Sequence, residues 1–253
     1  MKFKEVAAIL DGIPYTDLSK GKNFYDFVMD SRPRQCLEMG FAHGVSSCYF
    51  AAALHELGPD HHLTCVDLEN SSALDPTLET LLRRCNLSEK VTVVRVKSSY
   101  TWFLKRKIEE QSKRDGGRPI YDFCFIDGPK NWTIDGAAFF MVDKLLRDDG
   151  WLAFDDYAWT YREHQTRNGF SETDGVVHRT LERDEFEEPH VEAIFRLLVM
   201  QHPNYSNFKV QDNVLAWAQK RKGVLPHLSF ESSMSFKYKF VALAKQVMNR
   251  VRG

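Results

Sequence analysis

The chain lacks the features that mark membrane, secreted and cysteine-based metal proteins. Its 253 residues contain no apolar run of about 18 residues, the length that a membrane-spanning helix needs. Residues 1–6 lack the apolar core of a secretory signal. The five cysteines include no C-x-x-C pair, so neither a dithiol redox motif nor a cysteine zinc site is expected. We therefore expect a reduced, cytoplasmic protein without a transmembrane segment.

The chain also lacks an excess of charge of either sign. Its 34 lysines and arginines balance 35 aspartates and glutamates, for a formal net charge of −1. Such a balance gives no general attraction to nucleic acid or to an anionic membrane. No nucleic-acid partner is therefore expected, and the sequence shows no internal repeat that would predict a solenoid.

The middle of the chain contains a regular alternation of strand-like and helix-like segments. Five short apolar runs are separated by helical patterns with short connections. This alternation predicts an α/β fold with a Rossmann-like, doubly wound, mainly parallel sheet that helices cover on both faces. The expected strands are 36–39, 63–67, 91–96, 121–127 and 151–155, the expected helices are 48–57, 76–86, 100–111 and 134–146, and a turn is expected at 148–150.

The ends of the chain are predicted to add to this sheet. Runs at 208–210 and 214–217 flank a polar turn and predict a C-terminal antiparallel hairpin. We divide the chain into an N-terminal helical cap (1–30), the main domain (31–220) and a basic, partly helical tail (221–253). The tail has an apolar helical face, which we expect to dock on the domain or on a second subunit of a homodimer. Binding of the tail to a membrane surface or to nucleic acid is the less favoured alternative.

A glycine-containing loop follows the first predicted strand. Glu38 ends the apolar run, and Gly40 and Gly44 come just before the first helical pattern. Glycine at such positions lets the backbone approach a ligand without a Cβ in the way. A second acid, Asp67, ends the next strand, where it can bind ribose hydroxyls. The pattern predicts a nucleotide-binding edge of the sheet.

The later strands also end in polar side chains. Ser98 and Ser99 follow the third strand, Asp127 follows the fourth, and Asp155 and Asp156 follow the fifth. Carboxylates that converge at one sheet edge repel one another unless something neutralises them. A hard divalent cation such as Mg²⁺ prefers oxygen ligands of this kind. Helix capping and turn formation without a metal is the alternative reading of these aspartates.

The loop and the acids together resemble the class I S-adenosylmethionine-dependent methyltransferases over roughly residues 34–219. The Glu38-x-Gly40-x-x-x-Gly44-x-Ser46 pattern is similar to the loop of the catechol O-methyltransferase family, which holds the methionine part of the cofactor. The resemblance implies that Asp67 binds the ribose and that Ser98 or Ser99 lies near the adenine. The cofactor-binding residues that it implies are Glu38, Gly40, Phe41, Ala42, Gly44, Ser46, Asp67, Ser98, Ser99 and Asp127.

The second half of the pattern resembles two groups of O-methyltransferases, the catechol type and the macrocin type that acts on antibiotic sugars. Both imply a magnesium ion, here on Asp127, Asp155 and Asp156, that gathers the acceptor hydroxyl. Lys130 fits the catechol type, and three aspartates fit the sugar type. We expect Asp127, Asp155 and Lys130 to be catalytic, with Lys130 as a general base whose pKa is lowered by desolvation. The alternative interpretation is that Lys130 is an ordinary surface lysine in a turn.

The predicted activity is therefore methyl transfer to a hydroxyl of a small molecule, a phenol, a catechol or a sugar. Residues 157–186 are expected to form a lid over this acceptor, with Trp132 on its other side; the proposed lid residues are Trp159, Tyr161, Arg162, His164 and His178. Three alternatives stay open. A nicotinamide-dependent oxidoreductase would need a third glycine that the loop lacks. A nucleic-acid methyltransferase would need a basic face, and a non-catalytic nucleoside-binding module would not need the acids.

Overall fold

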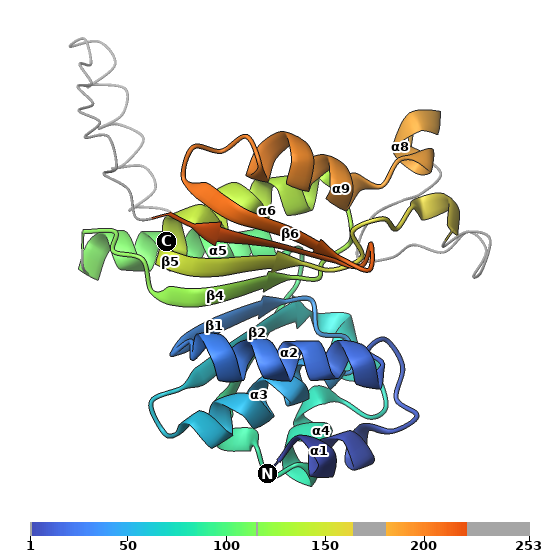
Figure 1. The fold of residues 1–253 in the computed structure, drawn as a ribbon, viewed down its shortest axis with the longest axis vertical. Helices are drawn as coiled ribbons and strands as arrows, with labels where there is room; N and C mark the ends of the chain where they lie inside the picture. The colour runs from blue at the N-terminus through green and yellow to red at the C-terminus, as the bar shows by residue number, and fades with distance from the viewer. Residues whose placement is uncertain (1, 115, 164–180, 222–253) are drawn as a thin grey trace, which may run out of the picture. The chain divides into compact units, whose positions relative to one another are not determined.

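A seven-stranded sheet organises residues 2–114, 116–163 and 181–221, the parts of the chain that the computed structural model describes (Figure 1). The strand order is β3-β2-β1-β4-β5-β7-β6. Strands β1 to β5 pair in parallel, whereas β7 runs antiparallel to both β5 and β6. The strands are β1 (Gln35–Met39), β2 (His62–Leu68), β3 (Val91–Val96), β4 (Tyr121–Ile126), β5 (Leu146–Phe154), β6 (Tyr205–Gln211) and β7 (Leu215–Lys220). The predicted mainly parallel sheet with a C-terminal hairpin is confirmed.

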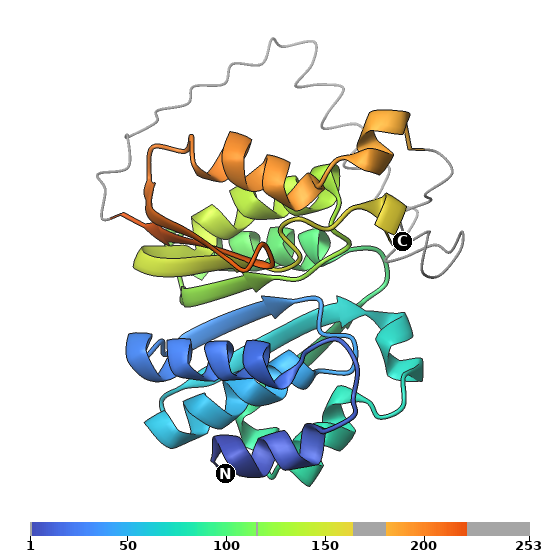
Figure 2. The ribbon, with the colours of Figure 1, turned by 45° about the vertical axis from the view of Figure 1, so that its right-hand side comes forward.

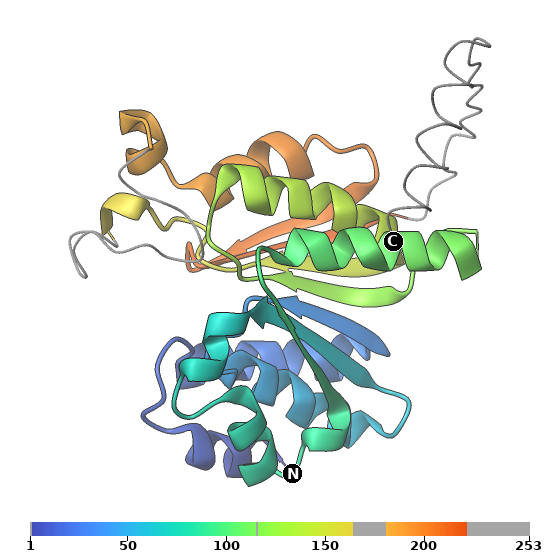
Figure 3. The same ribbon diagram turned by 180° about the vertical axis from the view of Figure 1, so that it is seen from behind.

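Helices cover both faces of this sheet, as Figures 2 and 3 show from two sides. One apolar core lies between the sheet and the layer of α1, α2, α3 and α4, and a second lies between the sheet and the layer of α5, α6 and α9. The helices are α1 (Phe3–Leu10), α2 (Leu18–Ser31), α3 (Val45–Leu57), α4 (Leu78–Arg84), α5 (Tyr100–Arg114), α6 (Trp132–Leu145), α8 (Arg183–Glu187) and α9 (His190–Ile194). Three short helices are η1 (Glu69–Ala73), η2 (Ser88–Lys90) and η4 (Phe195–Val199), the last a π-helix.

Helix α2 is fixed closely against α3. Its N-cap Asp17 accepts a hydrogen bond from the Lys20 backbone N–H at 2.8 Å, which starts the helix at Leu18. A Cβ at Gly21 would lie 2.3 Å from the ring of Tyr49 on α3, so only glycine permits this helix spacing. The two helices pack through the same apolar core. The predicted N-terminal cap is therefore helical, and α2 holds its first turn in a defined place.

The structure corrects one detail of the predicted elements and adds others. Residues 148–150, expected to form a turn, lie within the first half of β5, which begins at Leu146 and has an irregular register against β4. Helices α8 and α9 and the π-helix η4 were not predicted. Among the described residues, no helix is long and apolar enough to cross a membrane. The tail predicted at 221–253 lies outside the described residues, except for Arg221.

Candidate active site

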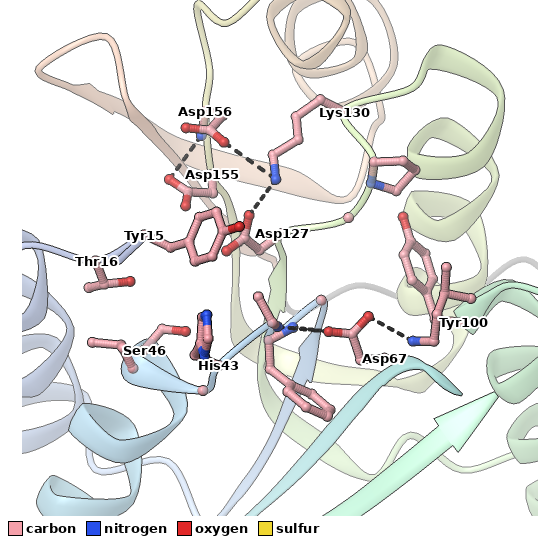
Figure 4. Close-up of a pocket in the computed structure, with 18 of the residues that line it drawn as sticks. Tyr15, Thr16, His43, Ser46, Asp67, Tyr100, Asp127, Lys130, Asp155 and Asp156 are labelled. Atoms are coloured by element: carbon pink, nitrogen blue, oxygen red, sulfur yellow. Dashed lines mark hydrogen bonds and ion pairs between the residues drawn. The ribbon is translucent and has the colours of Figure 1, made fainter. Parts of the chain in front are cut away.

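A cavity of about 560 Å³ opens at the carboxyl ends of the parallel strands (Figure 4). Binding sites in open α/β sheets lie at this edge, where loops from successive strands meet. Its lining includes Pro14, Tyr15, Thr16, Lys20, Gly40, Phe41, Ala42, His43, Gly44, Ser46, Asp67, Ser98, Ser99, Tyr100, Asp127, Lys130, Asp155, Asp156 and Trp159. All the residues predicted to be catalytic, cofactor-binding or metal-binding, except Glu38, therefore lie around one cavity.

The glycine loop (residues 40–46) forms one wall of this cavity. Gly40 and Gly44 have φ angles of +86° and +88°, in the left-handed region that favours glycine. A Cβ at Gly40 would lie 2.0 Å from the backbone oxygen of Asp127, and a Cβ at Gly44 would lie 2.3 Å from Leu78 Cδ1. Neither position can accept a side chain without moving its neighbours, so the loop requires glycine at both.

Asp67 ties this loop to the end of β2. Its Oδ2 accepts hydrogen bonds from the backbone N–H groups of Phe41 at 2.9 Å and Ala42 at 2.7 Å. Its Oδ1 accepts from the backbone N–H of Leu68 at 2.7 Å. Figure 4 shows these contacts on the cavity wall. The carboxylate predicted to bind ribose thus also shapes the loop that it faces.

Glu38 lies beneath the glycine loop and does not line the cavity. Its carboxylate is fully buried and accepts hydrogen bonds from the Ser46 hydroxyl at 2.6 Å, from the Ser47 hydroxyl and from the Cys65 thiol. Burial raises its pKa to about 7, although the two serine hydroxyls act in the opposite direction. The structure therefore corrects the expected role: Glu38 supports the loop from below and joins α3 to β1 and β2.

Three carboxylates gather at the opposite wall of the cavity and form what we call the acidic cluster. Asp127 follows β4, and Asp155 and Asp156 follow β5. One oxygen from each of the three lies within 4.8 Å of the others. The backbone brings them together, since the Asp155 N–H donates to the Ile126 oxygen at 3.1 Å and the two strands are neighbours. The sequence prediction that these three acids converge is borne out by this geometry.

Two lysine ammonium groups neutralise most of the charge of the acidic cluster. Lys130 Nζ lies 2.8 Å from Asp127 Oδ1 and 3.3 Å from Asp156 Oδ2. Figure 4 marks both contacts with dashed lines. Lys20 Nζ forms an ion pair with Asp155 Oδ2. The Lys20 side chain is 14% exposed and that of Asp155 is 3% exposed, so the second pair is largely shielded from water. Three negative charges therefore face two positive ones.

The expected low pKa of Lys130 is contradicted by this arrangement. Burial does lower its pKa, but the surrounding carboxylates, led by Asp127, outweigh that effect and raise the pKa well above its ordinary value. Lys20 behaves in the same way, with Asp155 as its strongest carboxylate neighbour. Burial and the neighbouring acids raise the pKa of Asp155. Lys130 is a protonated ammonium here, because three acids surround it.

The backbone at the acidic cluster is in an uncommon conformation. Lys130 has a φ of +56° and Asp156 a φ of +55°, although neither is glycine. A residue with a Cβ in the left-handed region costs about 1–2 kcal/mol. Such conformations persist where the surrounding structure fixes them, and they concentrate at functional sites. The side chains of these two residues form an ion pair at 3.3 Å.

Only some of the residues predicted to form the lid lie at the cavity. Trp159 lines the cavity as expected, but Tyr161 is fully buried and donates a hydrogen bond to the Pro129 oxygen at 2.9 Å. Arg162 pairs with Glu187, away from the cavity lining. Trp132 also lies outside the lining and borders a second, smaller cavity. His164 and His178 lie outside the described residues.

The N-terminal region contributes residues to the site that the sequence does not predict. Lys20 comes from the first turn of α2, and Pro14, Tyr15 and Thr16 come from the segment that precedes this helix. No motif marks Lys20, which is one of two lysines in a polar stretch. Only the packing of α2 on α3 reveals that it reaches an acid 135 positions later in the chain.

The cavity is suited to a nucleoside cofactor and to a divalent cation. Its volume falls within the usual range of about 300–1,000 Å³ for small-molecule sites. Gly40 and Gly44 let the loop pack directly against Asp127 and Leu78, which fixes its backbone along one wall of the cavity. The acidic cluster offers the carboxylate oxygens that Mg²⁺ prefers, on side chains that already lie within 4.8 Å of one another. The residues present fit both groups.

Comparison with known proteins agrees with this assignment. Residues 37–157 match the model of a family described as a methyltransferase domain. The matched stretch runs from β1 to the residue after Asp156 and so contains both the glycine loop and the acidic cluster. No curated protein sequence matches the chain. This match agrees with the predicted resemblance to the class I methyltransferases.

Solved structures show the same fold. An O-methyltransferase from Bacillus cereus in complex with SAH is 18% identical, with a TM-score of 0.55, and the match covers 87% of this chain and 90% of that chain. TomG, an O-methyltransferase from Streptomyces achromogenes involved in tomaymycin synthesis and solved with SAM, is 16% identical, with a TM-score of 0.56 and coverage of 87% and 89%. The SAH-bound methyltransferase PaMTH1 of Podospora anserina is 13% identical, with a TM-score of 0.58 and coverage of 87% of both chains.

Proposed function

We propose that this chain, which carries a methyltransferase domain with the class I fold, transfers a methyl group from S-adenosylmethionine to a hydroxyl group of a small molecule. One observation carries the proposal: a single cavity has the glycine loop and Asp67 on one wall and the acidic cluster on the other. The first wall suits a nucleoside, and the second suits an oxygen that must lose a proton. A methyl donor and an acceptor would meet between them.

The cofactor half of the proposal assigns roles along the glycine loop. The backbone of Gly40 to Gly44, with Ser46, would hold the methionine part, because these residues line the cavity and the close packing of the two glycines fixes the path of the loop. Asp67 and the turn at Ser98 and Ser99 line the neighbouring part of the cavity and would hold the ribose and adenine. SAM-bound and SAH-bound structures with the same fold support this assignment.

The acceptor half rests on the charges of the acidic cluster. Methyl transfer is an in-line displacement, so its catalysis depends mainly on positioning. Asp127, Asp155 and Asp156 would hold a Mg²⁺ ion, which would lower the pKa of a hydroxyl bound to it. The proton of the hydroxyl would pass to solvent water, and Lys130 would place its ammonium next to the acceptor oxygen and stabilise the negative charge left there. Trp159 would contact the acceptor ring, a phenol or a sugar.

Calorimetric titration with S-adenosylhomocysteine, with and without Mg²⁺, tests the proposal directly. We expect one binding site per chain in both conditions, since the glycine loop does not depend on the acidic cluster. A screen of phenols, catechols and sugars with S-adenosylmethionine would then identify the acceptor class. A chain that binds no S-adenosylhomocysteine, or that binds it with the glycine loop unprotected from hydrogen exchange, would contradict the proposal.

A further inference from the structure

Each carboxylate of the acidic cluster is already paired with a lysine of the same chain. Lys130 contacts Asp127 and Asp156, and Lys20 contacts Asp155, so each of the three carboxylates has an ammonium beside it. The cluster with its two lysines carries a net charge of −1. A divalent cation added to this arrangement would sit next to two ammonium groups, which repel it. At least one lysine must therefore give way before the ion can bind.

The two lysines differ in how firmly they are held. Lys130 lies three residues after Asp127, contacts two of the acids and has a left-handed backbone that the surrounding structure fixes. Lys20 comes from a different layer of the fold, contacts Asp155 alone and reaches it through a flexible four-carbon stem. It also lines the cavity, so its amine has room to move without unfolding α2. Lys20 is the partner that can leave.

We infer that Lys20 is a tethered cation that competes with the divalent ion for Asp155, so that metal binding and the Lys20–Asp155 ion pair exclude each other. The inference rests on the metal-assisted part of the proposed function and goes beyond it, because it assigns an antagonist to the ion. Lys20 keeps Asp155 neutralised while the site is empty. It leaves Asp155 when the ion arrives.

Mn²⁺ binding followed by electron paramagnetic resonance tests the competition without any turnover. The variants are Lys20→Met, which removes the charge but keeps most of the stem, and Lys20→Arg, which keeps the charge. We expect Lys20→Met to bind Mn²⁺ about tenfold more tightly than the wild type or better, a factor within the usual range of couplings between two sites. Lys20→Arg should stay close to the wild type.

Lys22→Met is the matched control for this experiment. Lys22 lies on the same helix, two residues away, and pairs with Asp26 where both side chains are about half exposed. Lys22→Met removes one positive charge, as Lys20→Met does, but it leaves the ion pair of Asp155 intact. The affinity for Mn²⁺ should therefore not change. Equal or weaker Mn²⁺ binding by Lys20→Met would overturn the inference, and so would an equal gain in Lys22→Met.

A second measurement uses the wild-type chain and does not depend on how a variant folds. An amine-reactive reagent should label Lys20 slowly without metal, and Mn²⁺ should increase that rate, because the displaced amine no longer pairs with Asp155. Unchanged labelling at saturating Mn²⁺ would overturn the inference. Absence of Mn²⁺ binding in every variant would also overturn it, whereas S-adenosylhomocysteine binding in the same preparations would show that the methyltransferase proposal survives.

Discussion

The two walls of the cavity are built by different physical means. The glycine loop is held by close packing at its two glycines and by hydrogen bonds from its backbone N–H groups to the Asp67 carboxylate, which span 25 and 26 positions of the chain. The acidic cluster is held by ion pairs, one of which joins residues 135 positions apart. A change of shape should therefore damage the first wall, and a change of charge should damage the second.

The largest effect should come from a methyl group added to the glycine loop. In Gly40→Ala the new Cβ would meet the Asp127 oxygen at 2.0 Å, and the φ of +86° adds strain of its own. Left-handed strain and overpacking together should cost about 5 kcal/mol. We expect S-adenosylhomocysteine binding to disappear from calorimetric titrations, with a large fall in the urea midpoint.

Gly12→Ala separates strain from collision. Gly12 has a φ of +78°, close to that of Gly40, but a Cβ there would meet nothing within 4 Å. This variant should lose only about 1–2 kcal/mol, the cost of the left-handed conformation alone. If both variants bind S-adenosylhomocysteine equally well, the close approach of the loop to Asp127 has no part in binding.

A charge change in the acidic cluster should stop turnover and spare cofactor binding. Asp155→Asn keeps the shape of a side chain that is 3% exposed but removes its charge. We expect kcat to fall about 10³-fold, or about 4 kcal/mol of transition-state stabilisation, with an acceptor identified in the screen. S-adenosylhomocysteine affinity should stay within about threefold, because the glycine loop is unchanged.

Asp26→Asn is the control for this charge change. Asp26 is an acid of α2 that pairs with Lys22 where both side chains are about half exposed, so its loss should leave kcat unaltered. Equal losses of turnover and of cofactor affinity in Asp155→Asn would contradict the division of the cavity into two walls.

The glycine loop could be predicted from the sequence because its determinants are local. Gly40 and Asp67 stand at the ends of strands that their own apolar runs define, and Gly44 directly precedes the helix that follows. A parallel sheet brings such strand ends together. The same reasoning placed Asp127, Asp155 and Asp156 correctly at one edge. The alternation of elements also gave the sheet, its parallel core and its antiparallel hairpin, since each depends on short-range patterns.

The parts that could not be predicted depend on tertiary contacts. Lys20 becomes a site residue only because α2 packs on α3 at the closeness that Gly21 allows. The pKa of Lys130 depends on the balance of burial against three acids, which spacing does not reveal. Helix α9 and the π-helix η4 follow a polar segment without a regular period. Glu38 was placed in the right loop but faces the core, because two serine hydroxyls draw it inward.

The smallest of the three predicted effects is a change of folding stability with pH that comes from the buried carboxyl group of Glu38. Burial raises the pKa of Glu38 from an ordinary value near 4.5 to about 7, so the folded state favours its protonated form. The resulting stabilisation is complete below pH 4.5 and is lost as the pH rises through about 7. At about 1.4 kcal/mol for each pH unit, the loss is on the order of 3 kcal/mol.

Glu38→Gln removes the titration and so isolates its contribution. Denaturant unfolding at pH 4.5, 6 and 8 should show the wild type losing stability relative to Glu38→Gln between pH 4.5 and 7, with no further relative change above pH 7. Glu89→Gln, at an exposed glutamate of η2, is the control. Its stability should change with pH in the same way as that of the wild type. The opposite result would be a wild type whose stability increases relative to Glu38→Gln as the pH rises. It would mean that the hydrogen bonds from the serine hydroxyls outweigh burial, and that the ionised form of Glu38 supports the glycine loop.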